Sequence, residues 1–275
     1  MTKKERGHLT ELYYFALSFF VYGFLGWCTE VAYAAAKQGK FVNRGFLNGP
    51  ICPVYGIGVG VVVQFLTPVE NNLVLLYISS TILVTVIEGI TGFLLEKIFH
   101  NKWWDYSEQP LNIGGYVCVL FSLIWGVFCV LIVKIIHPLI YKVLTMIPLV
   151  LGIVVMACLA VGLLADLYVT ASGILKMNRR LEAMEKIAAE LKELSDKVGE
   201  NIYENVMEGM EFREEKKARI EELKAKYEEM AENRTKVGER LVKAFPKMQV
   251  GQHKEIFEEP VSYTHLRAHE TLRHL

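Results

Sequence analysis

Residues Leu73–Phe99 read LVLLYISSTILVTVIEGITGFLLEKIF, an apolar run interrupted by Glu88 and closed by Glu96 and Lys97. A membrane helix needs about 20 largely apolar residues, so this run predicts one span. Four other apolar runs predict further spans, of which the second is short. They are Leu12–Ala36, Val54–Phe65, Tyr116–Ile136 and Leu144–Ser172. The sequence therefore predicts about five membrane spans.

The composition changes sharply after the last of these runs. Residues up to about Ser172 carry few charges, whereas Lys176 to about Pro260 are dense in Lys, Glu and Arg. We therefore expect an all-α protein, a polytopic membrane helix bundle followed by a cytoplasmic helical hairpin or coiled coil. The expected parts are residues 1–175, the membrane domain, 176–246, the helical domain, and 247–260, an irregular tail. The balanced net charge gives no sign of a nucleic-acid partner. The long apolar runs make the lipid bilayer the expected partner.

The segment Phe41–Pro53 separates the first two runs and is rich in Gly, Pro and Asn. Backbone that is not helical can exist at membrane depth only where protein covers it or where it lines a wet cavity. The segment is therefore expected either to lie at the membrane interface or to re-enter the bundle before the short second span.

The charged part has a helical repeat of apolar residues. They recur at steps of three and four at Leu181, Met184, Ala188, Leu191, Leu194 and Val198, and again at Ile220, Leu223, Tyr227, Met230, Val237 and Leu241. Pro246 is expected to end the second helix. Such a stripe predicts a helical hairpin or coiled coil, which offers a surface for homo-oligomers or for docking a partner.

The end of the chain has a different origin in our interpretation. Val261–Thr271 reads VSYTHLRAHET, which resembles the translation of a transposase-type sequencing adapter. We therefore expect residues 261–275 not to be native. On this interpretation His265, His269 and His274 form no metal site.

Three acids lie within the apolar runs, where an ionisable group is expensive unless it is paired or hydrated. Glu30 either reaches the interface or pairs inside the bundle with Arg44. Glu88 is either a protonated acid hydrogen-bonded across helices or a group that binds a proton or cation. Asp166, near the expected membrane interface, is assigned a structural or interfacial role.

Polar residues around Arg44 complete a candidate intramembrane site. Arg presents a planar fork suited to a carboxylate or a phosphate, and amide and hydroxyl groups nearby could line the same site. Asp105 follows a double tryptophan and either caps a helix or forms one wall of a polar mouth. The candidate set is Glu30, Asn43, Arg44, Asn48, Tyr55, Glu88, Asp105 and Asn112.

Enzyme signatures are missing from the sequence. It contains no Walker A motif, no HExxH, no G-x-S-x-G and no GxGxxG. The five cysteines form no CxxC pair and no zinc-type array with histidine. We therefore expect no cofactor, no metal and no ATP hydrolysis by this chain itself.

Several motifs together resemble one bacterial family of membrane proteins. They are Gly26-Trp27 leading to Glu30, Phe41–Leu47, Gly49–Gly56, Glu88, Leu95–Lys97, Trp103–Ser107, Asn112 and Phe121–Gly126. Across about Tyr13–Val161 the sequence resembles the CmpB-like family of ABC transporters, type IV. The resemblance implies a polytopic protein of the cytoplasmic membrane with a permease-like role, and it implies no substrate.

Three functions remain open at this point. The first is a transport-type membrane component that uses the Arg44 site and recruits a separate ATPase subunit through its helical tail. The second is a non-catalytic scaffold or regulator that acts through that tail. The third is an intramembrane enzyme of envelope or lipid metabolism, with Glu30 or Asp105 as acid or base. Basic residues in the short loops favour a cytoplasmic C-terminus in a bacterial membrane.

Overall fold

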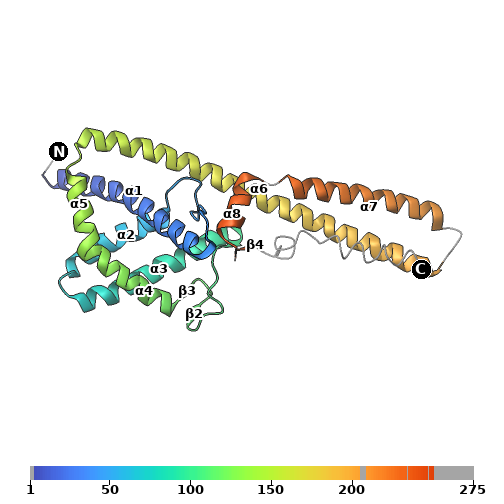
Figure 1. Ribbon diagram of the computed structural model, residues 1–275, viewed down its shortest axis with the longest axis horizontal. Coiled ribbons are helices and arrows are strands. Elements are labelled where there is room, and N and C mark those ends of the chain that lie inside the picture. The colour runs from blue at the N-terminus through green and yellow to red at the C-terminus, as the bar shows by residue number, and fades with distance from the viewer. Residues whose placement is uncertain (1–2, 205–208, 234, 247, 251–275) are drawn as a thin grey trace. The chain divides into compact units, whose positions relative to one another are not determined.

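The computed structural model describes residues 3–204, 209–233, 235–246 and 248–250 (Figure 1). The expected irregular tail beyond residue 250 and the adapter-like residues 261–275 lie outside this range. The helices are α1 (Lys3–Gln38), α2 (Pro53–Leu66), α3 (Leu73–Phe99), α4 (Val119–Leu131), α5 (His137–Thr145), α6 (Leu149–Glu204), α7 (Gly209–Glu232) and α8 (Lys236–Ala244). A 3-10 turn, η1 (Thr67–Val69), follows α2, and a π-helical turn, η2 (Ile132–Ile136), joins α4 to α5.

In the described part of the chain, the strands are only two residues long. They are β1 (Asn101–Lys102), β2 (Asn112–Ile113), β3 (Val117–Cys118) and β4 (Gln249–Val250). β2 and β3 pair antiparallel, with Asn112 opposite Cys118. The all-α fold expected from the sequence is confirmed.

The chain forms two compact units. The first contains Met1–Ser172 together with Arg240–Met248, and the second contains Gly173–Glu239 and Gln249 onward. The boundary at Gly173 falls inside the continuous helix α6. Most of α8 therefore belongs to the same unit as the apolar helices α1 to α5.

Among the residues that the structure describes, four helical segments are long and apolar enough to cross a membrane. They are Leu9–Gln38, Leu73–Phe99, Val119–Thr145 and Leu149–Lys197. The helix α2 is apolar too, but its 14 residues extend roughly 21 Å, less than the roughly 30 Å hydrocarbon core. The expected count of five spans stays a prediction, because it depends on what completes the crossing at α2.

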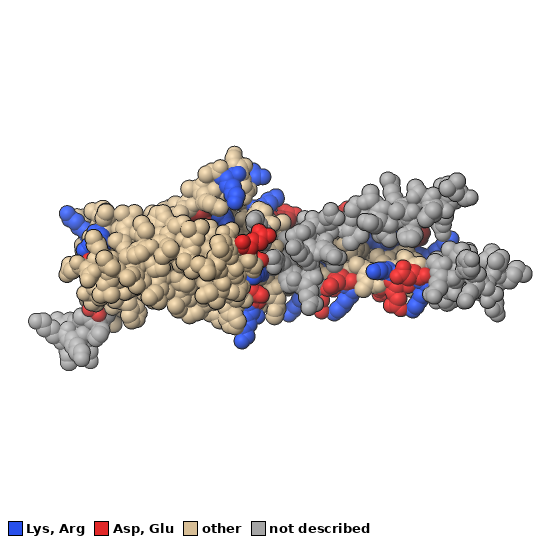
Figure 2. All heavy atoms as spheres, turned by 90° about the horizontal axis from the view of Figure 1, so that it is seen from below, with Lys and Arg blue, Asp and Glu red and all other residues tan. Residues whose placement is uncertain are grey.

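Large apolar side chains cover the outside of the first unit. On α3 and α6 alone they include Ile82, Val86, Ile90, Phe93, Val150, Val161, Leu164 and Tyr168. On the face shown in Figure 2, charged side chains gather toward the edges of this surface and leave a broad uncharged area. A surface of this kind is stable against lipid rather than water, so the chain is a membrane protein.

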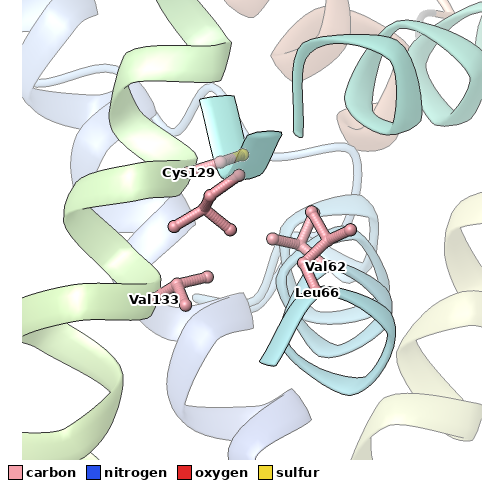
Figure 3. Packing of buried hydrophobic residues seen from close by; sticks show 5 residues of the cluster. Val62, Leu66, Cys129 and Val133 are labelled. Carbon is pink, nitrogen blue, oxygen red and sulfur yellow. The ribbon is translucent and has the colours of Figure 1, made fainter. Parts of the chain in front are cut away.

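The short helix α2 is enclosed by its neighbours. Val62 and Leu66 point toward Cys129 of α4 and Val133 of η2, and Leu76 of α3 completes this buried cluster (Figure 3). On the α1 side, Gly56 and Gly60 lie under Phe19 and Phe15. The small residues thus let the two helices approach closely, as expected for membrane helices.

Local sequence explains where the other helices begin and change. Asn72 caps α3 by accepting a hydrogen bond from the Leu75 N–H at 3.1 Å. His100 ends α3 in the left-handed region, with φ of 56°. Pro138 cannot donate to the carbonyl four residues earlier, so the helix widens into the π-helical turn η2 just before it.

The second unit contains a helical hairpin, which we define as α6 from Gly173 onward together with α7. Its buried cluster consists of Ile187, Leu191 and Leu223, with Leu194, Ile220, Tyr227 and Met230 packed against it. Arg219 of α7 pairs with Glu190 of α6 at 3.1 Å. The hairpin therefore buries Leu191, Leu194, Ile220, Leu223, Tyr227 and Met230 of the apolar stripe expected from the sequence. Val237 and Leu241 of that stripe lie on the separate helix α8, because α7 ends at Glu232 and not at Pro246.

Candidate functional site

The segment between α1 and α2, residues 39–52, runs back alongside α1 instead of leaving the bundle. Val42 shares a buried cluster with Ala34, and the Trp27 indole N–H donates to Oδ1 of Asn43 at 2.7 Å. The Cys52 N–H then donates to the Gly23 carbonyl at 2.9 Å. Gly23 lies roughly four helical turns before the end of α1. We call residues 39–52 the re-entrant loop.

Asn43 shapes the turn that begins this loop. Its side-chain oxygen also accepts the Gly45 N–H at 3.1 Å, and its amide donates to the Asn48 carbonyl at 2.7 Å. A single amide therefore satisfies backbone groups that have no helical partner. The role of Asn43 in this structure is to hold the loop that carries Arg44.

Arg44 projects from the loop onto α1. Its Nη1 lies 3.2 Å from Oε2 of Glu30, and the two side chains are 28% and 24% exposed. The hydroxyl of Tyr55 in the first turn of α2 donates to Oε1 of the same carboxylate at 2.6 Å. Glu30, Arg44 and Tyr55 thus form one cluster from three successive parts of the chain. The pairing of Glu30 with Arg44 corresponds to one of the two alternatives that the sequence left open for Glu30.

Two aromatic rings flank the Arg44 guanidinium. Its Cζ atom lies 4.7 Å from the ring centroid of Tyr33 and 6.0 Å from that of Phe245. Such contacts favour the cation while leaving its edge open for hydrogen bonds. The arrangement is chemically able to bind a carboxylate or phosphate group, or to exchange Glu30 for one.

A second polar cluster holds the other half of the loop. Oδ1 of Asp166 accepts the Asn48 N–H at 3.1 Å and the Asn48 side-chain amide at 2.9 Å. Its Oδ2 accepts the Gly49 N–H at 2.6 Å, and Thr170 donates to Oδ1 at 3.2 Å. Asp166 thus accepts hydrogen bonds from the loop backbone, and its structural role is to hold the loop in place.

Arg240 of α8 completes this second cluster. Its Nη1 and Nη2 donate to the carbonyls of Gly45 and Phe46 at 2.7 and 2.8 Å, and its Nε donates to Oδ1 of Asn48 at 3.0 Å. Burial lowers the pKa of Arg240, and the nearby Asp166 carboxylate acts in the opposite direction. The guanidinium remains charged, and it donates its hydrogen bonds to the loop rather than to a ligand.

Glu88 lies in a different environment, on α3. Its Oε1 accepts a hydrogen bond from the Tyr106 hydroxyl at 3.3 Å, and its Oε2 is buried without a protein hydrogen-bond partner. Burial raises the pKa of Tyr106, and the Glu88 carboxylate and, more weakly, Glu30 raise it further. Tyr106 therefore stays a protonated donor that lies within the electrostatic field of both glutamates.

Asp105 and Asn112 belong to a surface loop and not to either cluster. Asp105 accepts the Ser107 N–H at 3.0 Å and pairs with Lys102 at 2.9 Å. Burial acts to raise its pKa, but the hydrogen bonds from Ser107 and Lys102 win and hold the pKa at about 2. The side-chain amide of Asn112 donates to the carbonyls of Ser107 and Gln109, at 3.2 and 2.8 Å. Both residues act as turn formers here.

Gly115 explains why this loop closes so tightly. Its φ of 73° lies in the left-handed region, and a Cβ there would come within 2.5 Å of side-chain atoms of Asp105, Lys102 and Ser107. The polar mouth expected at Asp105 is therefore filled by the loop's own contacts. Within the part of the chain that the structure describes, no group of three or more His, Cys, Asp or Glu residues could hold a metal ion.

One family model matches residues 17–171, more than half of the chain, under the description "Putative ABC-transporter type IV". The chain belongs to this ABC-transporter family. No curated protein and no solved structure matches it. The resemblance seen in the sequence is thereby confirmed, and the chain is a membrane protein of a transporter-type family.

The region matched to the type IV family contains most of both clusters. Glu30, Arg44, Tyr55 and Asp166 lie inside residues 17–171, and Arg240 lies outside them. Of the candidate residues, the structure brings Glu30, Arg44 and Tyr55 together and places Asn43 and Asn48 in the loop that carries Arg44. It places Glu88 with Tyr106, and Asp105 and Asn112 in the surface loop.

Two residues of the second cluster, Thr170 and Arg240, were not candidates from the sequence. Thr170 is one turn beyond Asp166 on α6, a spacing at which two polar side chains share a helix face. Arg240 lies among many charged residues, but Leu241 and Ala244 beside it are fully buried. A short amphipathic pattern after the hairpin was therefore the available signal.

Proposed function

We propose that the chain is a transport-type, permease-like membrane component whose polar site is the cluster of Glu30, Arg44 and Tyr55. The observation that carries the proposal is that Arg44 stands on non-helical backbone beside α1 and pairs there with Glu30 at 3.2 Å. In transporters, binding sites typically form where a membrane helix is interrupted. Membership of an ABC-transporter family supports the same conclusion.

The proposal includes a membrane placement. The re-entrant loop supplies part of the second crossing and α2 supplies the rest, which would complete five spans. The contacts of α2 with α1 run antiparallel, since Gly56 meets Phe19 and Gly60 meets Phe15. We place the protein in the bacterial cytoplasmic membrane with the hairpin on the cytoplasmic side, following the basic residues of the loops.

Energy for transport would come from a separate ATPase subunit, because this sequence has no Walker A motif. The hairpin is the proposed docking element. Its apolar seam is closed by Ile187, Leu191 and Leu223, so a partner would meet its charged faces. Contacts of that kind should weaken as salt is raised.

The test begins with purification of the tagged chain from a bacterial host in mild detergent. We expect an ATP-hydrolysing subunit to co-purify with it at low salt. Replacing residues 190–220 with a four-residue Gly-Ser linker shortens the hairpin but keeps Arg240, and this variant should lose the subunit. An intact chain that never binds an ATPase at any salt concentration would rule out the ABC version of the proposal.

A matched variant separates docking from the site. Arg44→Gln should still bind the ATPase subunit but should abolish the stimulation of ATP hydrolysis by substrate candidates in nanodiscs. Carboxylates and phosphate esters are the first candidates, because they can replace Glu30 at the guanidinium. Equal stimulation in the Arg44→Gln variant and the parent chain would show that the transported group binds elsewhere.

A scaffold or regulator is the second candidate, and the self-contained hairpin supports it. The pairs Arg219–Glu190 and Arg180–Asn233 brace the hairpin without any help from a partner. If this function holds, Arg44→Gln should leave cellular activity intact while the shortened hairpin abolishes it. Homo-oligomers through the hairpin would appear as a mass change in the same comparison.

A further inference from the structure

We propose that residues 240–245, which are the part of α8 within the first unit together with Phe245, form a strap that closes over the Arg44 cluster. Asn48 is the residue through which this strap and α6 together hold the re-entrant loop. The inference rests on the proposed function for its purpose, since opening the strap would expose the proposed transport site. Its structural content rests only on contacts within the first unit.

Asn48 is hydrogen-bonded by residues that precede the hairpin in the sequence and by a residue that follows it. Its side-chain amide donates to Thr170 Oγ1 at 2.9 Å and to Asp166 at 2.9 Å, and its oxygen accepts from Arg240 Nε at 3.0 Å. The second unit begins at Gly173, just after Thr170, and the first unit resumes at Arg240. One side chain therefore joins the residues at which the chain leaves the first unit and returns to it.

Arg240 fixes the strap to the loop by three hydrogen bonds, one from each of its side-chain nitrogens. Three of its nitrogens donate to three acceptors within Gly45–Asn48. Charge-assisted bonds of this kind are stronger than neutral ones, and the planar fork demands one geometry. The carbonyls of Gly45 and Phe46 directly follow Arg44, so release of Arg240 frees the backbone that positions the Arg44 side chain.

The apolar side of the strap covers the same place. Leu241 and Ala244 are fully buried, and Ala244 packs with Ala34 and Val42. The Phe245 ring lies 6.0 Å from the Arg44 guanidinium carbon and 5.2 Å from the Trp103 ring. Lifting the strap would therefore remove one aromatic neighbour of Arg44 and expose Val42.

Cross-linking tests whether the strap packs against α1 when the protein is in a membrane. In a chain whose five native cysteines are replaced by serine, Ala34→Cys with Ala244→Cys should form a disulfide on mild oxidation, because both residues belong to one buried cluster. Ala34→Cys with Lys243→Cys is the control, because Lys243 is exposed on the same helix, and it should react far less. Equal yields from the two pairs, or none from either, would overturn the strap.

Thiol accessibility tests the latch. Val42→Cys, which replaces a side chain only 8% exposed, should react slowly with a water-soluble maleimide in nanodiscs. Adding Arg240→Ala should accelerate the reaction at least about tenfold, since losing one charge-assisted hydrogen bond can shift an equilibrium that far. Lys243→Ala and the residue-matched Arg219→Ala should leave the rate within about twofold. An unchanged rate in Arg240→Ala would overturn the latch.

The role of Asn48 is tested by combining variants. Asn48→Ala and Arg240→Ala should each accelerate the labelling of Val42→Cys, and the double variant should be no faster than the faster single one, because both break the same grip. If the rate increase in the double variant equals the product of the two single increases, the proposed role of Asn48 would be overturned. Arg240→Lys, which keeps the charge but loses the fork, guards against general misfolding and should give an intermediate rate. None of these readouts needs a substrate or an ATPase, so they can fail or succeed independently of the proposed transport function.

Discussion

Arg240 donates its Nε–H to Oδ1 of Asn48 at 3.0 Å, although 192 positions separate the two residues in the sequence. The same Asn48 binds Asp166 and Thr170 through its amide nitrogen. The loop that carries Arg44 is therefore fixed by the part of the chain that precedes the hairpin and by the part that follows it. Changes near either end of the hairpin should reach the Glu30–Arg44 pair through this contact.

Removing Arg44 should destabilise the membrane unit, because Glu30 would lose its ion pair and, among the described residues, keep the hydrogen bond from Tyr55. Both side chains are about one-quarter exposed, so we expect Arg44→Gln to lower the free energy of unfolding by about 1–3 kcal/mol, below the range for fully buried pairs. Thermal unfolding in nanodiscs measures this. Lys186→Gln, in an exposed pair with Glu182, should have no measurable effect, and the double variant Glu30→Gln/Arg44→Gln should recover part of the loss.

Asp166→Asn should destabilise the re-entrant loop, because the carboxylate accepts N–H groups from Asn48 and Gly49 and the Thr170 hydroxyl. An amide has one oxygen and no charge, so at least one of these bonds is lost and the others weaken. We expect a loss of roughly 2–4 kcal/mol in the free energy of unfolding. Asp196→Asn, an exposed position further along α6, is the matched control, and an equal effect there would contradict the assignment.

Gly56→Ala should loosen the packing of α1 on α2. A Cβ at Gly56 would lie 2.5 Å from the Phe19 carbonyl oxygen, so backbone would have to move. The expected loss is about 1–3 kcal/mol in the free energy of unfolding. Gly58→Ala lies on the same helix with its nearest neighbour at 3.9 Å, and it should be neutral or slightly stabilising. Comparable losses at both positions would argue against this helix contact.

The surface loop should open only in strong acid. The pKa of Asp105 is held at about 2 in the folded chain, below its ordinary value of 3.8. A lowered folded pKa means that the carboxylate stabilises the loop fully above about pH 4 and that this contribution is lost as the pH falls toward 2. Fluorescence of Trp104, whose indole bonds the Tyr116 carbonyl in this loop, should report the change.

The variant Asp105→Asn supplies the control for this titration. It removes the titrating group, so its loop fluorescence should already resemble the acid form at neutral pH. It should then show no further transition between pH 4 and pH 2. A transition of the same size in this variant would assign the effect to another residue.

Apolar run length predicted the long helices well, because a membrane span needs a long apolar sequence whatever its neighbours are. The pair Glu30 and Arg44 was predictable for a similar reason, since charges at this depth need partners close by. The sequence could not place Asp166 against Gly49, because that contact depends on how α6 packs on the loop. Only the structure shows that Asp166 belongs to the second polar cluster, with Asn48 and Thr170.

Asp105 and Arg240 show the limits of pattern in opposite directions. Asp105 accepts the Ser107 N–H and forms a local turn, which is a common role for aspartate. The two tryptophans before it had suggested the wall of a polar mouth instead. Arg240 looked like one more surface charge, because only tertiary contact distinguishes a buried arginine from its exposed neighbours. Long-range hydrogen bonds leave no periodic signal in a single sequence.

The way the re-entrant loop is satisfied has a consequence for biosynthesis. The N–H groups of Asn48 and Gly49 find their acceptor in Asp166, and the carbonyls of Gly45 and Phe46 find their donor in Arg240. A nascent chain leaves the ribosome from its N-terminus, so the first spans emerge long before these partners exist. The loop can therefore reach its final conformation only at the end of synthesis, which makes completion of the site a late step in the assembly of the protein.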